Sequence, residues 1–230
     1  MIDATTGGPA DGAPVPQRSL DEALGRCPLL PVLVVDEGTD GVELGRVLVE
    51  GGLGCAEVTL RTPAALRVLE EMAATPGLLV GAGTVLRDAQ VAAAVVAGAA
   101  FCVSPGLDEG VIAAAAEHGV LGVPGVASAT EVQRASRLGL RLLKLFPAQP
   151  LGGPAMVRAL AGPFPEVRFV PTGGVGPEVV PDYLALPSVA GVGGSWFVDR
   201  RRVAALDGHD RGASRALVDE VAAAVRSVTP

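Results

Sequence analysis

The chain has 230 residues, 49% of them hydrophobic and only 3% aromatic, which is enough for a sizeable core built mainly from small aliphatic side chains. Its formal net charge is −7 and its only run of basic residues is Arg200 to Arg202, so nucleic acid and anionic membranes are not expected as partners. Three separated cysteines and two histidines form no metal-binding motif and fit a reducing cytoplasm.

The first segment, residues 1–18, is expected to be a disordered arm. Residues 7–17 are rich in Gly, Pro and Ala, and no basic region followed by an apolar core marks a secretion signal. Farther along, the longest uncharged stretch, residues 91–107, is interrupted by Gly98 and by a Ser-Pro pair. We therefore expect no membrane-spanning segment.

From Ser19 onward, short apolar runs alternate with longer runs of helical period, which is typical of β/α units that build a parallel sheet. After a helix at Ser19–Cys27, strands are predicted at Leu29–Val35, Ala56–Leu60, Leu78–Thr84, Phe101–Pro105, Leu121–Gly125, Leu142–Pro147, Arg168–Gly174 and Val189–Ser195. Helices are predicted at Gly41–Gly52, Thr62–Thr75, Arg87–Gly98, Asp108–Gly119, Ser128–Gly139, Gly152–Gly162, Pro177–Leu186 and Ala213–Val228. Eight such units, repeating every ~20–27 residues, favour a closed eight-fold β/α (TIM) barrel over an open doubly wound sheet. We expect one α/β domain over residues 19–230, with the first helix covering the bottom of the barrel.

Function in such barrels sits at the carboxyl ends of the strands, and the only lysine of the chain, Lys144, lies at one of them. The chain otherwise uses 17 arginines as its basic residues, whereas Lys144 stands among leucines in a predicted buried strand. Because charging an ammonium in such a place is costly, we expect this amine to be neutral for much of the time, and a neutral amine is a nucleophile. The alternative is a strand-end lysine that extends to solvent.

A carboxylate is predicted to face this lysine. Glu57 lies within the second strand, and strands two and six stand on opposite walls of an eight-stranded barrel, so Glu57 can serve as an acid/base beside Lys144. The alternative is a buried structural ion pair. Arg61 shares the strand face of Glu57; its planar guanidinium suits a substrate carboxylate, although it could also be a surface cation.

Two glycine-rich turns follow strands seven and eight, at residues 172–174 and 193–195. Turns at this place in a barrel commonly bind phosphate through backbone N–H groups, because glycine lets the anion approach closely. Each glycine pair taken singly is more often only a tight turn. Together, at neighbouring strand ends, they predict a phosphorylated substrate.

Several motifs in order resemble one family, the class I 2-keto-3-deoxy-6-phosphogluconate (KDPG) aldolases, which also act on 4-hydroxy-2-oxoglutarate (KHG). The resemblance covers residues 29–198. The motifs that carry it are Glu57–Thr62, Gly81–Leu86, Ser104–Gly106, Pro124–Gly125, Lys144–Ala148, Pro171–Gly174 and Gly193–Trp196. It implies a homotrimeric barrel with no metal and no cofactor, in which Lys144 carries an imine and Glu57 moves protons.

The resemblance also assigns the remaining site residues. It implies that Arg61 and Thr84 bind the pyruvate carboxylate, that Pro105 and Phe146 line the keto-acid pocket, and that Thr172 discriminates the configuration at C4. Phosphate would bind at Gly173, Gly174, Gly194 and Ser195. Two departures stand out: Leu145, expected to point outward, replaces a frequent second Phe, and the segment Asp199–Gly212 is unlike the usual tail.

The activity implied by the resemblance is cleavage of KDPG to pyruvate and D-glyceraldehyde 3-phosphate, a step of the Entner–Doudoroff pathway, together with cleavage of KHG to pyruvate and glyoxylate. One alternative is the galactonate-series aldolase, which accepts the C4 epimer; Thr172 speaks against it by resemblance. A second is a non-catalytic barrel that binds phosphosugars. A third is a phosphosugar isomerase or synthase, which does not need a lysine within a strand.

Overall fold

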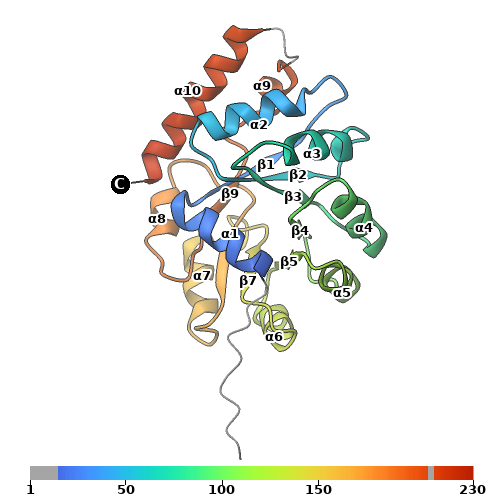
Figure 1. The fold of residues 1–230 in the computed structure, drawn as a ribbon. Helices are drawn as coiled ribbons and strands as arrows, with labels where there is room; N and C mark the ends of the chain where they lie inside the picture. Colours follow the sequence, from blue (N-terminus) through green and yellow to red (C-terminus); the bar gives the residue numbers. More distant parts are fainter. Residues whose placement is uncertain (1–14, 207–209, 230) are drawn as a thin grey trace, which may run out of the picture.

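The computed structural model describes residues 15–206 and 210–229, and its strands form a parallel β/α barrel (Figure 1). The strands are β1 (Leu29–Leu33), β2 (Cys55–Thr59), β3 (Leu79–Gly83), β4 (Phe101–Val103), β5 (Leu121–Val123), β6 (Gly125–Val126), β7 (Leu142–Leu145), β8 (Arg168–Pro171) and β9 (Val192–Gly194). Strands β5 and β6 correspond to one predicted strand that is interrupted at Pro124. The interruption has a physical cause, since proline has no backbone N–H to donate to a neighbouring strand.

The strands close into a ring through two seams. Six pair in the order β5-β4-β3-β2-β1-β9, and the other three pair in the order β6-β7-β8. At one seam the Lys144 N–H donates to the Pro124 carbonyl oxygen at 2.9 Å, and at the other a parallel bridge joins Thr172 to Gly193. The predicted eight-fold barrel is therefore confirmed, with β5 and β6 together as its fifth strand.

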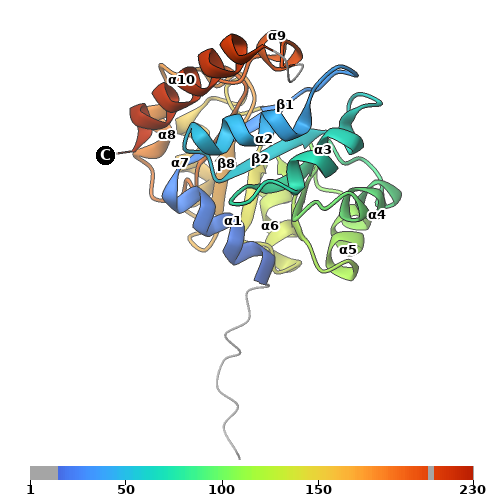
Figure 2. The same cartoon turned by 45° about the horizontal axis from the view of Figure 1, so that its top comes forward.

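Helices surround this ring (Figures 1 and 2). They are α1 (Val15–Arg26), α2 (Gly41–Glu50), α3 (Ala65–Ala73), α4 (Asp88–Val96), α5 (Glu109–Glu117), α6 (Ala129–Arg137), α7 (Pro154–Ala161), α8 (Val180–Leu184), α9 (Arg200–Ala204) and α10 (Arg211–Val228). Aspartate or serine side chains cap several helix starts: Asp40, Asp108 and Ser128 accept hydrogen bonds from the backbone N–H three residues onward. Helix α10 lies along α2.

Alternating strand residues separate an inner layer from an outer one. Leu30 and Phe101 belong to the inner cluster, where Leu20 and Leu24 of α1 also pack, so α1 covers the end of the barrel at which the strands begin. Leu145 points to the outer layer and packs among the apolar residues beneath the helices, as expected for this departure from the family pattern. Farther along the strands, toward their carboxyl ends, the inner positions are occupied by polar residues such as Glu57, Thr59 and Lys144.

Several sequence-based boundaries were wrong by a few residues. Helix α1 begins at Val15 rather than Ser19, so the last residues of the expected arm belong to it, while residues 1–14 lie outside the described part of the chain. Helix α3 begins at Ala65 rather than Thr62, and α8 has only five residues. The short helix α9 was not predicted; it holds the exposed arginine run, in which Arg200 pairs with Asp36. Within the described residues, no helix is both long and apolar enough to cross a membrane.

Candidate active site

The carboxyl ends of the strands enclose a cavity of about 380 Å³ that contains every site residue expected from the sequence. The lining comprises Val32, Glu57, Thr59, Arg61, Thr84, Pro105, Lys144, Phe146, Thr172, Gly173, Gly174, Val175, Gly193, Gly194 and Ser195. These residues lie on or just after every strand of the ring except β5 and β6, which explains why they lie far apart in the sequence.

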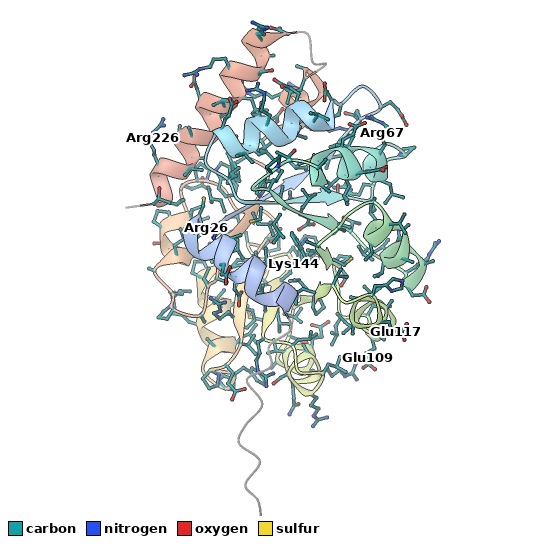
Figure 3. All side chains as sticks on the ribbon, viewed as in Figure 1. Arg26, Arg67, Glu109, Glu117, Lys144 and Arg226 are labelled. Carbon is teal, nitrogen blue, oxygen red and sulfur yellow. The ribbon has the colours of Figure 1, made fainter. Side chains whose placement is uncertain are left out.

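At the base of the cavity lies a buried amine–carboxylate pair. The Nζ atom of Lys144, on β7, stands 3.4 Å from Oε1 of Glu57, on β2, and the two residues are 7% and 1% exposed. Lys144 lies near the middle of the molecule, whereas Arg67, Glu117 and Arg226 lie at its periphery (Figure 3). The extension of Lys144 to solvent, left open by the sequence, is therefore contradicted.

Among the described residues, the amine–carboxylate pair has a free carboxylate oxygen and an aromatic ring beside it. Oε2 of Glu57 is buried without a hydrogen-bond partner among the described residues, so it is free to accept a bond from a molecule in the cavity. The Phe146 ring, whose centroid is 5.3 Å from Nζ of Lys144, forms an apolar wall beside the amine. A flat adduct on Nζ can pack against this ring.

Arg61 and Thr84 stand where β2 and β3 end. Arg61 is exposed, and its backbone turns away from the strand through a hydrogen bond from its N–H to the carbonyl oxygen of Thr59. Thr84 has a φ of 55°, a left-handed conformation that a β-branched residue rarely adopts. Such conformations occur often at ligand sites, and this one places Thr84 on the cavity wall.

The turn after β8 is built from two consecutive left-handed glycines. Gly173 and Gly174 have φ values of 97° and 74°, which only glycine adopts without strain. Space at the first position is also limited, because a Cβ on Gly173 would lie 3.1 Å from the Phe146 ring, a tight contact. The backbone of this turn is therefore open to the cavity and can receive an anion.

The turn after β9 lies beside it. The Thr172 side chain packs directly over Gly193, whose added Cβ would overlap Oγ1 of Thr172. At the next position, the ring of Trp196 covers Gly194 in the same way, so a side chain at Gly194 would displace the indole. Gly193, Gly194 and Ser195 all line the cavity.

The three cysteines lie outside this cavity as buried, free thiols. Burial raises the pKa of both Cys55 and Cys102 to about 12, so these thiols stay protonated and unreactive at neutral pH. Within the described part of the chain, no cluster of three or more His, Cys, Asp or Glu side chains could hold a metal ion.

Three lining residues, Val32, Thr59 and Val175, were given no role from the sequence, and Gly193 was expected only as part of the turn after strand eight. Strand parity places Thr59 on the same face as Glu57, and in the structure its hydroxyl donates a 2.8 Å hydrogen bond to the Leu33 carbonyl oxygen. Val32 and Val175 carry no chemical signal in the sequence. Only the closed ring reveals their position.

The chain is similar to the members of one known protein family. The sequence profile of the KDPG and KHG aldolase family matches residues 20–210. The chain belongs to this family. A 2-dehydro-3-deoxy-phosphogluconate aldolase of Treponema pallidum is 46% identical over 187 residues, which make up 81% of this chain and 89% of the relative.

Solved structures of KDPG aldolases have the same fold. The enzyme of Zymomonas mobilis with 3-phosphoglycerate is 40% identical, with a TM-score of 0.79 over 93% of this chain and 99% of the other. The KDPG aldolase of Legionella pneumophila holds pyruvate captured as a covalent carbinolamine intermediate. It is 37% identical, with a TM-score of 0.81 over 89% of this chain and 97% of the other. The family profile also continues through Asp199 into the segment that looked unlike the usual tail.

Proposed function

We propose that this chain is a class I aldolase that cleaves KDPG to pyruvate and D-glyceraldehyde 3-phosphate through an imine on Lys144. The observation that carries the proposal is the pair of Lys144 and Glu57, 3.4 Å apart in a cavity at the carboxyl ends of the strands. The names of the relatives and the covalent carbinolamine in the Legionella pneumophila structure support the same chemistry.

The reaction begins at the amine. Glu57 takes a proton from Lys144, and the neutral Nζ adds to the C2 ketone of the substrate to form a carbinolamine. Glu57 then returns a proton to the hydroxyl on C2, which leaves as water, and the lysine nitrogen and C2 become a cationic imine. The short distance between the two groups allows these transfers without a large movement of either side chain.

Cleavage follows from the electron demand of this cation. Glu57 removes the proton of the C4 hydroxyl, the C3–C4 bonding electrons move toward the imine nitrogen, and C4 leaves as the aldehyde carbon. The resulting enamine is protonated at C3 by Glu57, and water hydrolyses the imine to release pyruvate and free Lys144. Phe146 packs beside the imine and limits the access of water until the aldehyde has left.

Binding groups at either side of the cavity hold the two ends of the substrate. Arg61 and Thr84 bind the carboxylate, while the N–H groups and hydroxyl of Gly173, Gly174, Gly194 and Ser195 bind the phosphate. Pro105 lines the keto-acid part, and Thr172 stands beside C4, where it selects the gluconate-series configuration. KHG has no phosphate, so of these contacts it makes only those to the keto-acid end.

The proposal includes assembly and location. A homotrimer is expected from the family resemblance, and a reducing cytoplasm suits three free, buried thiols. Light scattering on the purified protein tests the trimer.

A paired kinetic assay tests the substrate. Pyruvate release is measured from KDPG, from its C4 epimer and from KHG, and the three values of kcat/KM are compared. We expect KDPG to rank first. A preference for the epimer would instead identify a galactonate-series aldolase, and no release from any of the three would identify a barrel without this activity.

A further inference from the structure

Gly83, at the end of β3, lies directly against the side chain of Glu57. The two neighbouring strands pair in parallel, with Thr59 opposite Gly83 and Glu57 opposite Gly81. A Cβ added to Gly83 would overlap Oε1 and Cγ of Glu57 and would lie 2.5 Å from Cδ. The Glu57 side chain therefore lies across Gly83, in the space that a side chain there would fill.

The oxygen that a side chain at residue 83 would displace is the one that faces Lys144. Oε1 of Glu57, which a Cβ at residue 83 would overlap, is also the atom 3.4 Å from Nζ of Lys144. The backbone at Gly83 does not itself require glycine, because its φ lies outside the left-handed region. The reason for glycine here is space, and the group that uses the space is the carboxylate.

We propose that Gly83 is a positioning residue for catalysis: its missing side chain holds the Glu57 carboxylate against Lys144. This inference rests on the function proposed above, in which Glu57 carries protons. A catalytic group displaced by roughly 1 Å can lose about 10²-fold in rate. A single methyl group at this position is therefore expected to slow turnover although it touches no substrate atom.

The same strand supplies a matched control. Gly81 also faces inward, two residues earlier, and its φ likewise lies outside the left-handed region, but an added Cβ there would overlap the ring of Phe101 instead of Glu57. Both Gly→Ala changes add one methyl group to the inner face of β3. Only the change at Gly83 should act through the carboxylate.

The test is a double-mutant cycle on kcat for KDPG. Gly83→Ala, Gly81→Ala and Glu57→Gln are measured singly, and each alanine variant is then combined with Glu57→Gln. We expect Gly83→Ala to lower kcat by about 10²-fold in the parent and by less than about threefold once Glu57→Gln is present. The factor by which Gly81→Ala lowers kcat should be the same in the parent and in the Glu57→Gln variant.

A thermal unfolding series tests the contact independently of activity. The clash caused by Gly83→Ala should lower the unfolding midpoint, and Glu57→Ala should recover most of that loss by removing the overlapping atoms. The loss caused by Gly81→Ala should not be recovered. This series stays decisive where Gly83→Ala is too unstable to assay.

Three results would overturn the inference: full turnover in Gly83→Ala, an equal cost of that change with and without Glu57→Gln, or an unfolding midpoint that Glu57→Ala does not recover. An equal loss of kcat with and without Glu57→Gln would mean that Gly83→Ala acts through neighbouring Thr84 or through the barrel as a whole. Failure of the proposed function looks different: either the parent releases no pyruvate from KDPG, or Glu57→Gln alone leaves kcat unchanged, and in both cases the unfolding series can still show the contact.

Discussion

Nζ of Lys144 and Oε1 of Glu57 lie 3.4 Å apart although they belong to strands on opposite walls of the barrel. The pair is not sealed in the core, as a purely structural ion pair would be; it forms part of the lining of a cavity of about 380 Å³. One carboxylate oxygen, Oε2, has no partner among the described residues. An amine and a carboxylate in contact with such a space are placed to act on a bound molecule.

Glu57→Gln is expected to keep the fold and slow turnover by ~10²–10⁴-fold, the usual contribution of a positioned acid/base. The amide has nearly the same shape as the carboxylate, so it fills the same place beside Gly83, but it cannot take the proton from Lys144 or from the substrate. Steady-state kcat for KDPG, with circular dichroism to check the fold, measures the effect. Turnover close to that of the parent would show that Glu57 has only a structural role.

Arg61→Ala is expected to weaken pyruvate binding by about 1.5–3 kcal/mol, or roughly 10- to 150-fold, which is the scale of a hydrogen bond to a charged group. Pyruvate inhibition of KDPG cleavage gives the affinity. Arg215→Ala, an exposed arginine on α10 outside the cavity, is the matched control and should change nothing. If Arg61→Ala bound pyruvate as tightly as the parent, the carboxylate would have to bind elsewhere.

Ser195→Ala is expected to lower kcat/KM for KDPG by about tenfold and to leave that for KHG nearly unchanged, because only KDPG carries the phosphate that the Ser195 hydroxyl would bind. Ser195 is a better probe than Gly194, since a side chain at Gly194 would also displace Trp196. Equal losses on both substrates would argue against phosphate binding at this turn.

The buried thiols predict a loss of stability at alkaline pH. The pKa of Cys55 and of Cys102 is about 12 in the folded protein, whereas in the unfolded chain it is near 9. Above pH 9 the unfolded chain therefore releases protons that the folded chain keeps, and each thiol lowers the free energy of unfolding by about 1.4 kcal/mol per pH unit.

Urea unfolding at pH 8 and at pH 10 measures this effect. Replacing both Cys55 and Cys102 by alanine should remove most of the difference between the two pH values. Cys27 and Tyr183, whose pKa values are also raised by burial, contribute to what remains. An unchanged pH dependence in the double variant would assign it to other groups.

The barrel was predictable from the sequence because its β/α repeat is a local signal. The base of the site was predictable because strand parity and the single lysine are local signals too. Parity placed Glu57 and Lys144 on the inner face and Leu145 on the outer one, as the structure has them. The break at Pro124 was missed because it depends on which neighbour needs an N–H there. Helix α9 was missed because five residues are too few for a clear period.

Other features depend on contacts between distant segments. Val32 and Val175 resemble any core residue in the sequence, and only closure of the ring brings them to the cavity. The same holds for Gly83, which in the sequence is one glycine of the Gly81–Leu86 motif at the end of a predicted strand. Its contact with Glu57 depends on the register of β2 against β3, which sequence reasoning did not assign.

Covalent trapping of pyruvate shows directly whether Lys144 forms the imine. The protein is incubated with pyruvate, reduced with borohydride and digested, and the modified peptide is identified by mass spectrometry. The chain offers one lysine and one α-amino group, and the α-amino group serves as the internal comparison for labelling outside the cavity. We predict one pyruvyl unit per chain, on the peptide that contains Lys144, and loss of both labelling and cleavage in Lys144→Arg, because a guanidinium stays charged and cannot form the imine. Cleavage by Lys144→Arg at the parent rate, or an adduct found only on Met1, would contradict the account.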